Sequence, residues 1–240
     1  MSTALPTIDS DEPLLLRGDQ DAVATLTLNR PNARNALTQE LMAQIQSQLD
    51  SLAEDETVKA VIIGGSGPAF CAGHDLKEIR SNNRRKIFES LFAQCSRLMT
   101  SIVRLPKPVI ARVHGIATAA GCQLVASCDL AVASTDAHFA TPGVNIGLFC
   151  STPMVAVSRT VNRKQTMEML LTGTPISSER ARELGLINRV VEPKLLNAET
   201  HELARSIASK SPLTVKIGKE AFYRQLEMDL DSAYALTSKA

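Results

Sequence analysis

The sequence predicts an α/β protein. Short runs rich in β-branched and other apolar residues alternate with longer stretches whose apolar residues recur at helical spacing. A strand, a glycine-containing turn and a helix follow one another at residues 59–77, and the same order returns at residues 109–127. The chain has 240 residues, of which 44% are hydrophobic, so it can bury a substantial core in one large domain or two small ones.

Composition and charge argue against several classes of protein. Lysine and arginine number 26 against 25 aspartate and glutamate, which argues against a nucleic-acid-binding protein. No apolar run approaches the roughly 20 residues of a membrane span, and the acidic first residues do not resemble a signal peptide. The cysteines form no CxxC motif and predict reduced, mostly buried thiols in a cytoplasmic protein without a metal site. They are Cys71, Cys95, Cys122, Cys128 and Cys150.

In the first half of the chain, turn residues and apolar spacing define the expected elements. Thr38 is the expected N-cap of a helix whose apolar residues share one face. Asp75 is expected to cap a short helix or fix its loop, as the helix dipole prefers a carboxylate there. The expected elements are a hairpin of strands 14–17 and 23–29 around a turn at 18–21, a helix at 38–53, a strand at 59–63, a small-residue stretch at 69–73, a short helix from residue 74 and a long amphipathic helix at 82–105.

The second half is organised around residues 107–134. Small residues at 119–122 (Ala-Ala-Gly-Cys) begin a helix, and unpaired N–H groups at such a turn suit an oxygen that gains negative charge. A tight turn in a packed core is the alternative interpretation. The expected elements are strands at 108–113, 130–133 and 187–191, helices at 120–127, from 151, at 163–171, 178–184 and 194–209, and a final helix after Pro212 that includes residues 222–230.

Several motifs occur in order from about residue 23 to the end of the chain. They read LNRP at 28–31, NAL at 35–37, FCAGHDLKE at 70–78, KPVIARVHG at 107–115, CDLAVA at 128–133, LTG at 171–173 and GLIN at 185–188. In this order and spacing the chain resembles the enoyl-CoA hydratase/isomerase family, the crotonase superfamily. The segments GHD at 73–75, AAGCQ at 119–123 and GLFCS at 147–151 are most similar to the subgroup of enoyl-CoA hydratase domain-containing protein 3.

The resemblance implies a crotonase-like spiral of ββα units at residues 1–192, followed by a helical C-terminal part at 193–240. Other members usually continue beyond Tyr234 with a further segment. The resemblance also implies trimers or hexamers and an acyl-CoA thioester as the ligand, with no separate cofactor. By motif position, the backbone N–H groups of His74 and Ala120 would hold the thioester oxygen. The remaining implied substrate contacts are Arg34, Ala36, Ala72, Asp75, Leu76 and Lys77.

Two positions depart from the family pattern. Hydratases carry a glutamate where this chain has Gln123, and a second glutamate where it has Gly143. Hydration needs a general base and a general acid, and neither residue exchanges a proton near neutral pH. Asn145, Ser151 and the His74 ring are candidates for a replacement group, although Ser151 also suits a helix N-cap and the His74 ring also suits packing.

We therefore expect a protein of the hydratase type whose hydration activity is weak or altered. Two alternatives remain open from the sequence. One is another thioester reaction, such as isomerisation, thioester hydrolysis or C–C cleavage, that uses the same pair of N–H donors. The other is an acyl-CoA-binding protein without catalytic activity.

Overall fold

The computed structural model describes residues 12–81 and 85–239. Its strands form two sheets, and the larger sheet is parallel except for its first pair. The larger sheet has the order β1-β2-β3-β5-β7-β10, with β1 Leu15–Gln20, β2 Val23–Leu28, β3 Ala60–Gly65, β5 Val109–Val113, β7 Leu130–Ser134 and β10 Arg189–Val191. The smaller sheet has the order β4-β6-β8-β9, with β4 Ala69–Cys71, β6 Ile116–Thr118, β8 His138–Ala140 and β9 Ile176–Ser177.

The predicted N-terminal hairpin is confirmed, but its turn lies further along the chain. Gln20 pairs with Val23, so the two-residue turn consists of Asp21 and Ala22, with φ angles of 55° and 60°. Two left-handed residues give a turn whose twist matches that of the strands it joins. Gly18, expected in the turn, is therefore part of β1.

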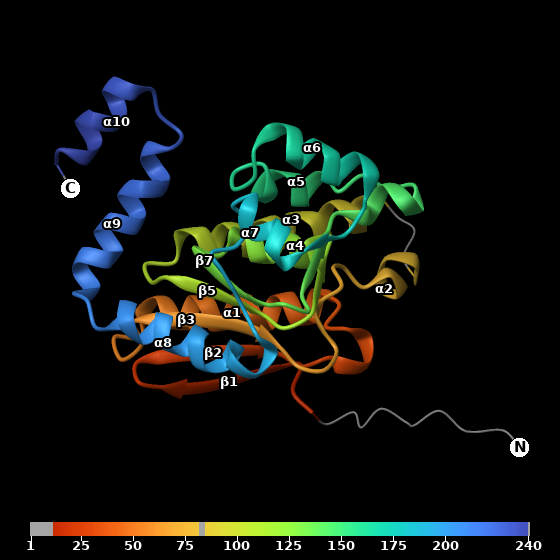
Figure 1. Ribbon diagram of the computed structural model, residues 1–240, viewed down its shortest axis with the longest axis horizontal. Helices are drawn as coiled ribbons and strands as arrows, with labels where there is room; N and C mark the ends of the chain where they lie inside the picture. The colour runs from red at the N-terminus through yellow and green to blue at the C-terminus, as the bar shows by residue number, and fades with distance from the viewer. Residues whose placement is uncertain (1–11, 82–84, 240) are drawn as a thin grey trace, which may run out of the picture.

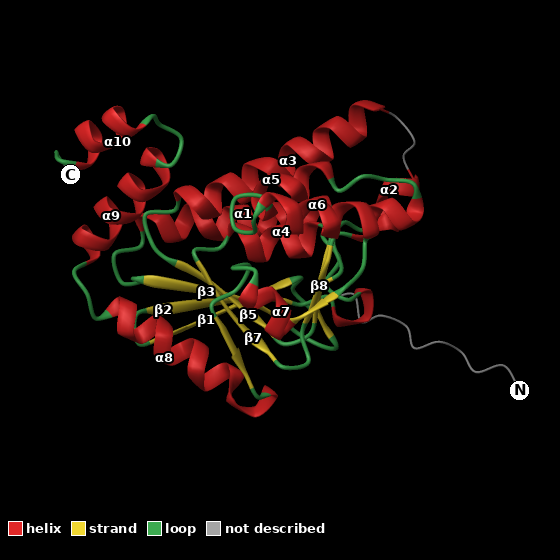
Figure 2. Cartoon of the chain, turned by 45° about the horizontal axis from the view of Figure 1, so that its top comes forward, coloured by secondary structure: helices red, strands yellow, loops and turns green. Residues whose placement is uncertain are grey.

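Helices cover both faces of the larger sheet (Figure 2). On one face, α8 (Leu196–Ala208) packs its Leu196, Ala204 and Ala208 against Ile62 and Ile110 of the strands. On the other face lie α1 (Gln39–Glu54), α3 (Arg85–Arg104) and α4 (Ala120–Ser127). The remaining elements of the body are η1 Pro31–Ala33, α2 Leu76–Ser81, η2 Pro142–Ile146, α5 Ser151–Val157, α6 Arg163–Thr172, α7 Ser178–Glu183 and η3 Pro193–Leu195.

Local sequence signals place most of these helices correctly. Thr38 accepts a hydrogen bond from the Leu41 N–H at 3.1 Å and caps α1, as predicted. Helix α4 begins and ends at the residues that the sequence predicts. The first residues expected for the long amphipathic helix, 82–84, lie outside the described residues. A domain boundary near residue 193 stays a prediction.

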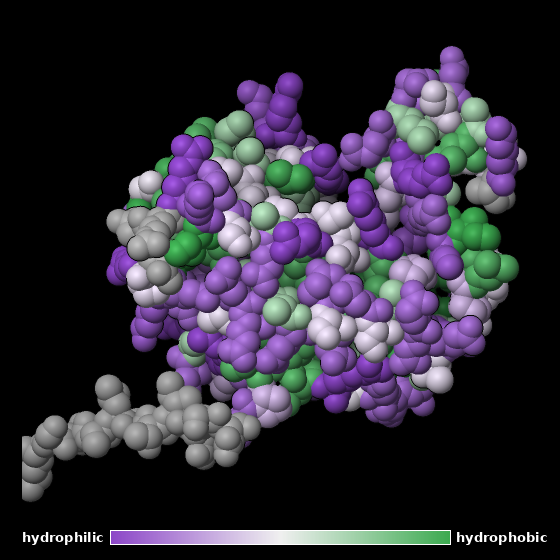
Figure 3. Space-filling view, turned by 180° about the vertical axis from the view of Figure 1, so that it is seen from behind, coloured by the Kyte–Doolittle hydropathy of each residue, from purple (hydrophilic) through white to green (hydrophobic). Residues whose placement is uncertain are grey.

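Helices α9 (Pro212–Gln225) and α10 (Leu230–Thr237) project from the body (Figure 1). The single helix expected after Pro212 is wrong. Helix α9 ends at Gln225. Asp229 then accepts a hydrogen bond from the Ser232 N–H at 3.0 Å and caps a second helix. Neither helix has a buried residue, and apolar side chains gather on this lobe (Figure 3). The large exposed ones are Leu213, Ile217, Phe222, Leu226, Leu230 and Tyr234.

A buried polar cluster ties α9 to the sheet. The Lys219 ammonium donates to Asp129 Oδ2 at 2.6 Å, and the Tyr223 hydroxyl donates to Asp129 Oδ1 at 2.9 Å. Lys219 also donates to the backbone oxygens of Ile102 and Lys107. Because the Lys219 side chain is only 8% exposed, this cluster sets the position of α9 on the body.

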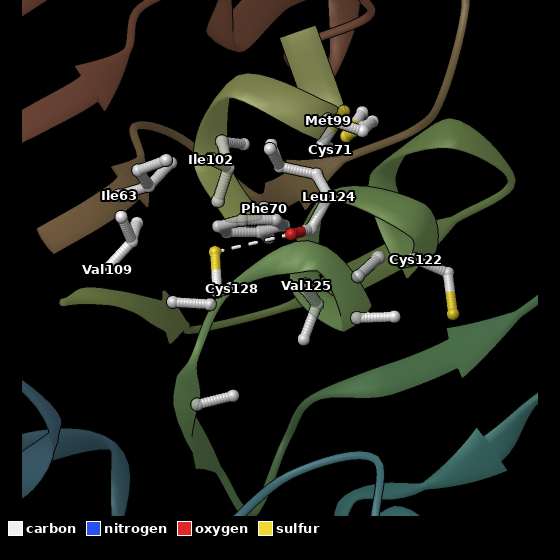
Figure 4. Close-up of a cluster of buried hydrophobic side chains, with 14 of the residues drawn as sticks. Ile63, Phe70, Cys71, Met99, Ile102, Val109, Cys122, Leu124, Val125 and Cys128 are labelled. Atoms are coloured by element: carbon white, nitrogen blue, oxygen red, sulfur yellow. Dashed lines mark hydrogen bonds between the residues drawn. The ribbon is translucent and has the colours of Figure 1, made fainter. Parts of the chain in front are cut away.

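The core between the sheets and helices contains four cysteines, which are Cys71, Cys95, Cys122 and Cys128. All five cysteines of the chain are buried and unpaired, as the sequence predicts. Figure 4 shows Phe70 of β4 packed among Ile102, Leu124 and Cys128, whose thiol donates to the Leu124 carbonyl at 3.3 Å. Within residues 12–81 and 85–239, no helix is long and apolar enough to cross a membrane, and no group of three or more side chains could hold a metal ion.

Candidate active site

Two turns made of small residues meet where β4 ends and α4 begins. Gly73 has a φ of +92°, and a Cβ atom on it would lie 2.9 Å from Ala119 Cβ and 3.2 Å from Ala120 N. A Cβ atom on Gly121 would overlap the carbonyl oxygen of Cys71. Because only glycine permits this approach from each side, the two turns are held in direct contact.

The Ala119 backbone is strained where it enters α4. Its φ of 50° and ψ of −117° are rare for a residue with a Cβ atom. The Ala119 N–H donates to the Ala140 carbonyl at 2.9 Å, which fixes this conformation against β8. Ala120 is the first residue of α4, so its N–H has no acceptor within the helix.

His74 and Leu37 form an isolated parallel β-bridge, which leaves the His74 N–H without an acceptor. The Leu37 N–H donates to the Gly73 carbonyl at 2.7 Å, and the Asp75 N–H donates to the Leu37 carbonyl at 3.0 Å. Within the described residues, neither the His74 N–H nor the Ala120 N–H donates a hydrogen bond. Two unpaired donors from two touching turns can stabilise an oxygen that gains negative charge.

A continuous wall of side chains links the two turns. The His74 ring lies edge-on to Phe92 of α3, with 5.6 Å between the ring centroids. One turn further along α3, the Cys95 thiol lies 3.8 Å from Gln123 Oε1. Gln123 is only 3% exposed, and it follows Ala120 by one turn of α4. Gln123, where the resemblance implies a glutamate in hydratases, is therefore part of the same wall.

The His74 ring is buried and neutral near pH 7. Burial lowers the pKa of its imidazole from 6.5 to about 4. The Leu37 backbone beside the ring raises the pKa and so opposes burial, but neither ring nitrogen has a partner at hydrogen-bond geometry among the described residues. Such a ring is a weak base, but it offers one donor and one acceptor to a neighbouring group.

The Cys150 thiol lies beside Gly143, the position where the resemblance implies a second glutamate. The Gly143 N–H donates to Cys150 Sγ at 3.3 Å, and a Cβ atom on Gly143 would lie 2.9 Å from that sulfur. It would also lie 3.0 Å from the Leu148 carbonyl oxygen. The sequence predicts neither this contact of Cys150 nor the contact of Phe92 with His74, because both join separate segments of the chain.

Asn145 and Ser151, the other candidates for a replacement group, contact their own loop and the end of α6. Asn145 is exposed, and its Nδ2 lies 2.8 Å from the position of a Cβ atom on Gly173 at the end of α6. The Ser151 hydroxyl donates to the Phe149 carbonyl at 3.3 Å. The prediction that Ser151 is a helix N-cap is wrong, because the N-cap of α5 is Cys150 and Ser151 is already helical.

The loop before α2 combines fixed and exposed side chains. Arg30 donates to Asp75 Oδ2 at 3.0 Å, while Asp75 Oδ1 accepts from the Lys77 N–H at 2.9 Å. Burial by itself would raise the pKa of Asp75, but the hydrogen bonds from Arg30 and the first turn of α2 bring the pKa below its usual value. Asp75 is a cap and loop-fixing carboxylate, as predicted.

The predicted substrate contacts in this region differ in exposure. The side chains of Arg34, Leu76 and Lys77 are exposed and lie around the Asp75 turn. Ala36 is buried, and its carbonyl accepts from Arg30 at 2.5 Å. The Ala72 N–H donates to the Arg34 carbonyl at 3.0 Å, which joins the loop to the end of β4.

Comparison with known proteins identifies the family of this chain. The pattern described as enoyl-CoA hydratase/isomerase matches residues 18–240. The chain belongs to the enoyl-CoA hydratase/isomerase family. The predicted crotonase fold is confirmed by a crystal structure of an enoyl-CoA hydratase from Mycobacterium smegmatis, which is 56% identical with a TM-score of 0.93, over 95% of this chain and 89% of that one.

Relatives within this enoyl-CoA hydratase/isomerase family confirm the predicted subgroup. Enoyl-CoA hydratase domain-containing protein 3 of Mus musculus is 47% identical over 97% of this chain and 77% of its own length. The Homo sapiens protein of the same name is 49% identical over 92% of this chain and 73% of its own length.

The same relatives correct the predicted location. Both proteins are named as mitochondrial, which contradicts the cytoplasmic location expected from the cysteines. Buried free thiols indicate only a reducing compartment, so they do not distinguish between compartments that are equally reducing.

Proposed function

We propose that this family member binds acyl-CoA thioesters and polarises the thioester carbonyl. The observation that carries the proposal is the pair of unpaired backbone donors, His74 N–H and Ala120 N–H, on two touching turns. A carbonyl oxygen between them would gain two hydrogen bonds that strengthen as negative charge develops on it. The chemistry would be that of a lyase or isomerase that stabilises an enolate-like thioester.

The coenzyme A part would lie along the loop before α2. Arg34 and Lys77 offer exposed cations there for phosphate groups, and Leu76 offers an apolar side chain. The backbone of this loop would be shaped by Ala36, Ala72 and Asp75. Asp75 would not contribute a free charge, because its carboxylate already accepts a hydrogen bond from Arg30. Coenzyme A would enter as part of the substrate, and no separate cofactor is proposed.

Hydration would be weak or altered at this site. Gln123 cannot act as an acid or a base, and Gly143 has no side chain while the Cys150 thiol lies beside it. Isomerisation or another thioester reaction would need a different proton carrier, for which the Ser151 hydroxyl and the His74 ring are the available groups. Asn145 carries an amide like Gln123, so it could only orient a group by hydrogen bonding. A binding protein without turnover is the second candidate function, and the buried, neutral surroundings of Gln123 favour it.

We also propose a trimer, or a dimer of trimers. The apolar residues of α9 and α10 are exposed in the single chain and form an apolar surface on this lobe. Closed symmetric oligomers are the usual way to bury such a surface.

Isothermal calorimetry with three matched ligands tests the proposed site. Butyryl-CoA carries the thioester carbonyl, S-butyl-CoA is the thioether without that oxygen, and free CoA lacks the acyl chain. We expect the affinity to fall in that order, with a loss of roughly tenfold or more when the carbonyl is removed. Equal affinity for the thioester and the thioether would contradict polarisation by the two N–H groups, and no binding at millimolar ligand would contradict acyl-CoA binding.

A further inference from the structure

Helices α1 and α3 lie side by side and enclose an open groove (Figure 2). The groove has a volume of about 570 Å³, and sites for small ligands typically have about 300–1,000 Å³. Gln46 of α1 reaches across it, because its Nε2 donates to Ser101 Oγ of α3 at 2.9 Å and to Asp50 Oδ1 at 2.7 Å. Every residue that lines the groove is polar or charged: Gln46 and Asp50 of α1, and Ser96, Arg97, Thr100, Ser101 and Arg104 of α3. The groove therefore suits a polar ligand.

Two arginines in this groove lack an anionic partner. Within residues 12–81 and 85–239, neither Arg97 nor Arg104 forms an ion pair. The cause is local, because no acidic residue stands three or four positions from either arginine along α3. Arg85 of the same helix has such a neighbour and pairs with Glu89 at 2.8 Å. The groove therefore offers a bound anion two unpaired guanidinium groups, whose residues are about 10 Å apart along the helix axis.

The two walls of the groove offer opposite hydrogen-bonding groups. The α3 wall offers donors, because Ser101 Oγ accepts from Gln46 and its O–H can still donate beside the two arginines. The α1 wall offers an acceptor, because Asp50 Oδ2 accepts no hydrogen bond within the described residues. Guanidinium groups match phosphate oxygens, whereas a carboxylate repels phosphate and accepts hydrogen bonds from hydroxyl groups. A ligand that matches both walls carries a phosphate on one side and hydroxyl groups on the other.

We propose that this groove binds a small phosphorylated polyol, either a sugar phosphate or a nucleoside monophosphate. Arg97 and Arg104 bind the phosphate, and Asp50 accepts hydrogen bonds from the sugar hydroxyls. The groove is on the exposed face of α3, whereas Cys95 is on the buried face of that helix and lies 3.8 Å from Gln123 Oε1. Binding in the groove therefore does not depend on the proposed acyl-CoA site.

Calorimetry on the full chain tests the proposal. The probes are ribose 5-phosphate, AMP, inorganic phosphate and ribose, each titrated with and without saturating butyryl-CoA, which keeps AMP out of the proposed coenzyme A channel. We expect ribose 5-phosphate or AMP to bind roughly tenfold more tightly than inorganic phosphate or ribose, because only the phosphorylated sugars contact both walls. A preference for ribose 5-phosphate would identify a sugar phosphate, and a preference for AMP would identify a nucleotide.

Single variants then assign the residues. Arg97→Gln and Arg104→Gln should each weaken the preferred probe by roughly tenfold, the effect of about one hydrogen bond to a charged group. Asp50→Ala should weaken the preferred probe but not inorganic phosphate, so the affinity ratio between the two should fall toward one. Arg85→Gln is the matched control, because Arg85 is an exposed arginine of α3 outside the groove, and it should keep the wild-type affinities.

Three results would overturn the proposal. The first is that neither ribose 5-phosphate nor AMP binds more tightly than inorganic phosphate, which would leave only unspecific attraction of anions. The second is an unchanged affinity in both Arg97→Gln and Arg104→Gln. The third is loss of binding when butyryl-CoA is added, which would place the probe in the coenzyme A channel.

Chemical modification of the wild-type protein needs no variant. Phenylglyoxal reacts with accessible arginines, and mass spectrometry of the digested protein follows each one. The preferred probe should slow the modification of Arg97 and Arg104 but not that of Arg85. Equal rates with and without the probe at Arg97 and Arg104 would also contradict binding in the groove.

Discussion

Cys150 Sγ lies 2.9 Å from the position that a Cβ atom on Gly143 would occupy. That separation is too short for two unbonded atoms, so any side chain at position 143 must move Cys150 or the loop. We expect Gly143→Ala to lower the free energy of unfolding by about 1–3 kcal/mol, as overpacking does. Gly18→Ala is the control, because nothing lies within 4 Å of a Cβ atom there. Urea unfolding measures both.

The same contact predicts that a second substitution can offset the destabilisation caused by Gly143→Ala. Cys150→Ala removes the sulfur, so it should recover part of the stability lost in Gly143→Ala. A double-mutant cycle should show a favourable coupling of about 0.5–3 kcal/mol. Strictly additive effects would mean that the backbone oxygen of Leu148, which lies 3.0 Å from the same Cβ position, is the true obstacle.

Hydration of crotonyl-CoA should be slow in the wild-type protein. A positioned acid or base is worth about 10²–10⁴-fold, and both are absent here, although such effects do not simply add. We expect Gln123→Glu with Gly143→Glu to raise the rate only when Cys150→Ala makes room for the new side chain. Loss of the enoyl absorbance follows the reaction. A wild-type kcat/KM in the ordinary range of about 10⁴–10⁸ M⁻¹s⁻¹ would show that another group supplies the proton transfer.

The buried His74 ring predicts a pH dependence of stability. Its pKa is about 4 in the folded chain and 6.5 in the exposed state, so the unfolded chain binds a proton first as the pH falls. The free energy of unfolding should therefore decrease between about pH 6.5 and 4, by about 3 kcal/mol from this group. In His74→Phe this part of the pH slope should be missing. An unchanged slope in urea titrations of the variant would show that the ring is solvated.

The Lys219 cluster predicts the anchoring of α9. Lys219→Met leaves Asp129 buried without its cation, which typically costs about 3–5 kcal/mol. Tyr223→Phe removes one hydrogen bond to the same carboxylate and should cost less, about 1–2 kcal/mol. Lys216→Met is the matched control, since Lys216 is an exposed lysine of the same helix. Hydrogen exchange in α9 should be much faster in Lys219→Met, moderately faster in Tyr223→Phe and unchanged in Lys216→Met.

The exposed apolar lobe predicts the assembly. Light scattering of the wild-type protein at micromolar concentration should give the mass of three or six chains. Phe222→Glu together with Leu226→Glu should shift the mass toward one chain, because each charge would have to be buried in the interface. Glu220→Gln on the same helix is the control and should leave the mass unchanged. A monomeric wild-type protein would contradict the proposed oligomer.

The sequence by itself determined the α/β class, the family and most helix bounds. These depend on local signals, such as Thr38 as a cap and the apolar spacing of α1. The small residues at 73 and 119–121 are a further local signal, because they let the two turns approach each other closely. Gln123 and Gly143, the positions where the resemblance implies the family's two glutamates, are likewise visible without coordinates.

Only the tertiary structure decided how separate segments meet. The strands of the smaller sheet have two or three residues each, too few to show an alternating pattern, so the sequence does not predict β4, β6 or β9. The break between α9 and α10 was missed because their apolar residues face outward and carry no core periodicity. The contacts of Cys150 with Gly143 and of Phe92 with His74 depend on packing between elements, and local spacing in a sequence reports only which face of an element is apolar.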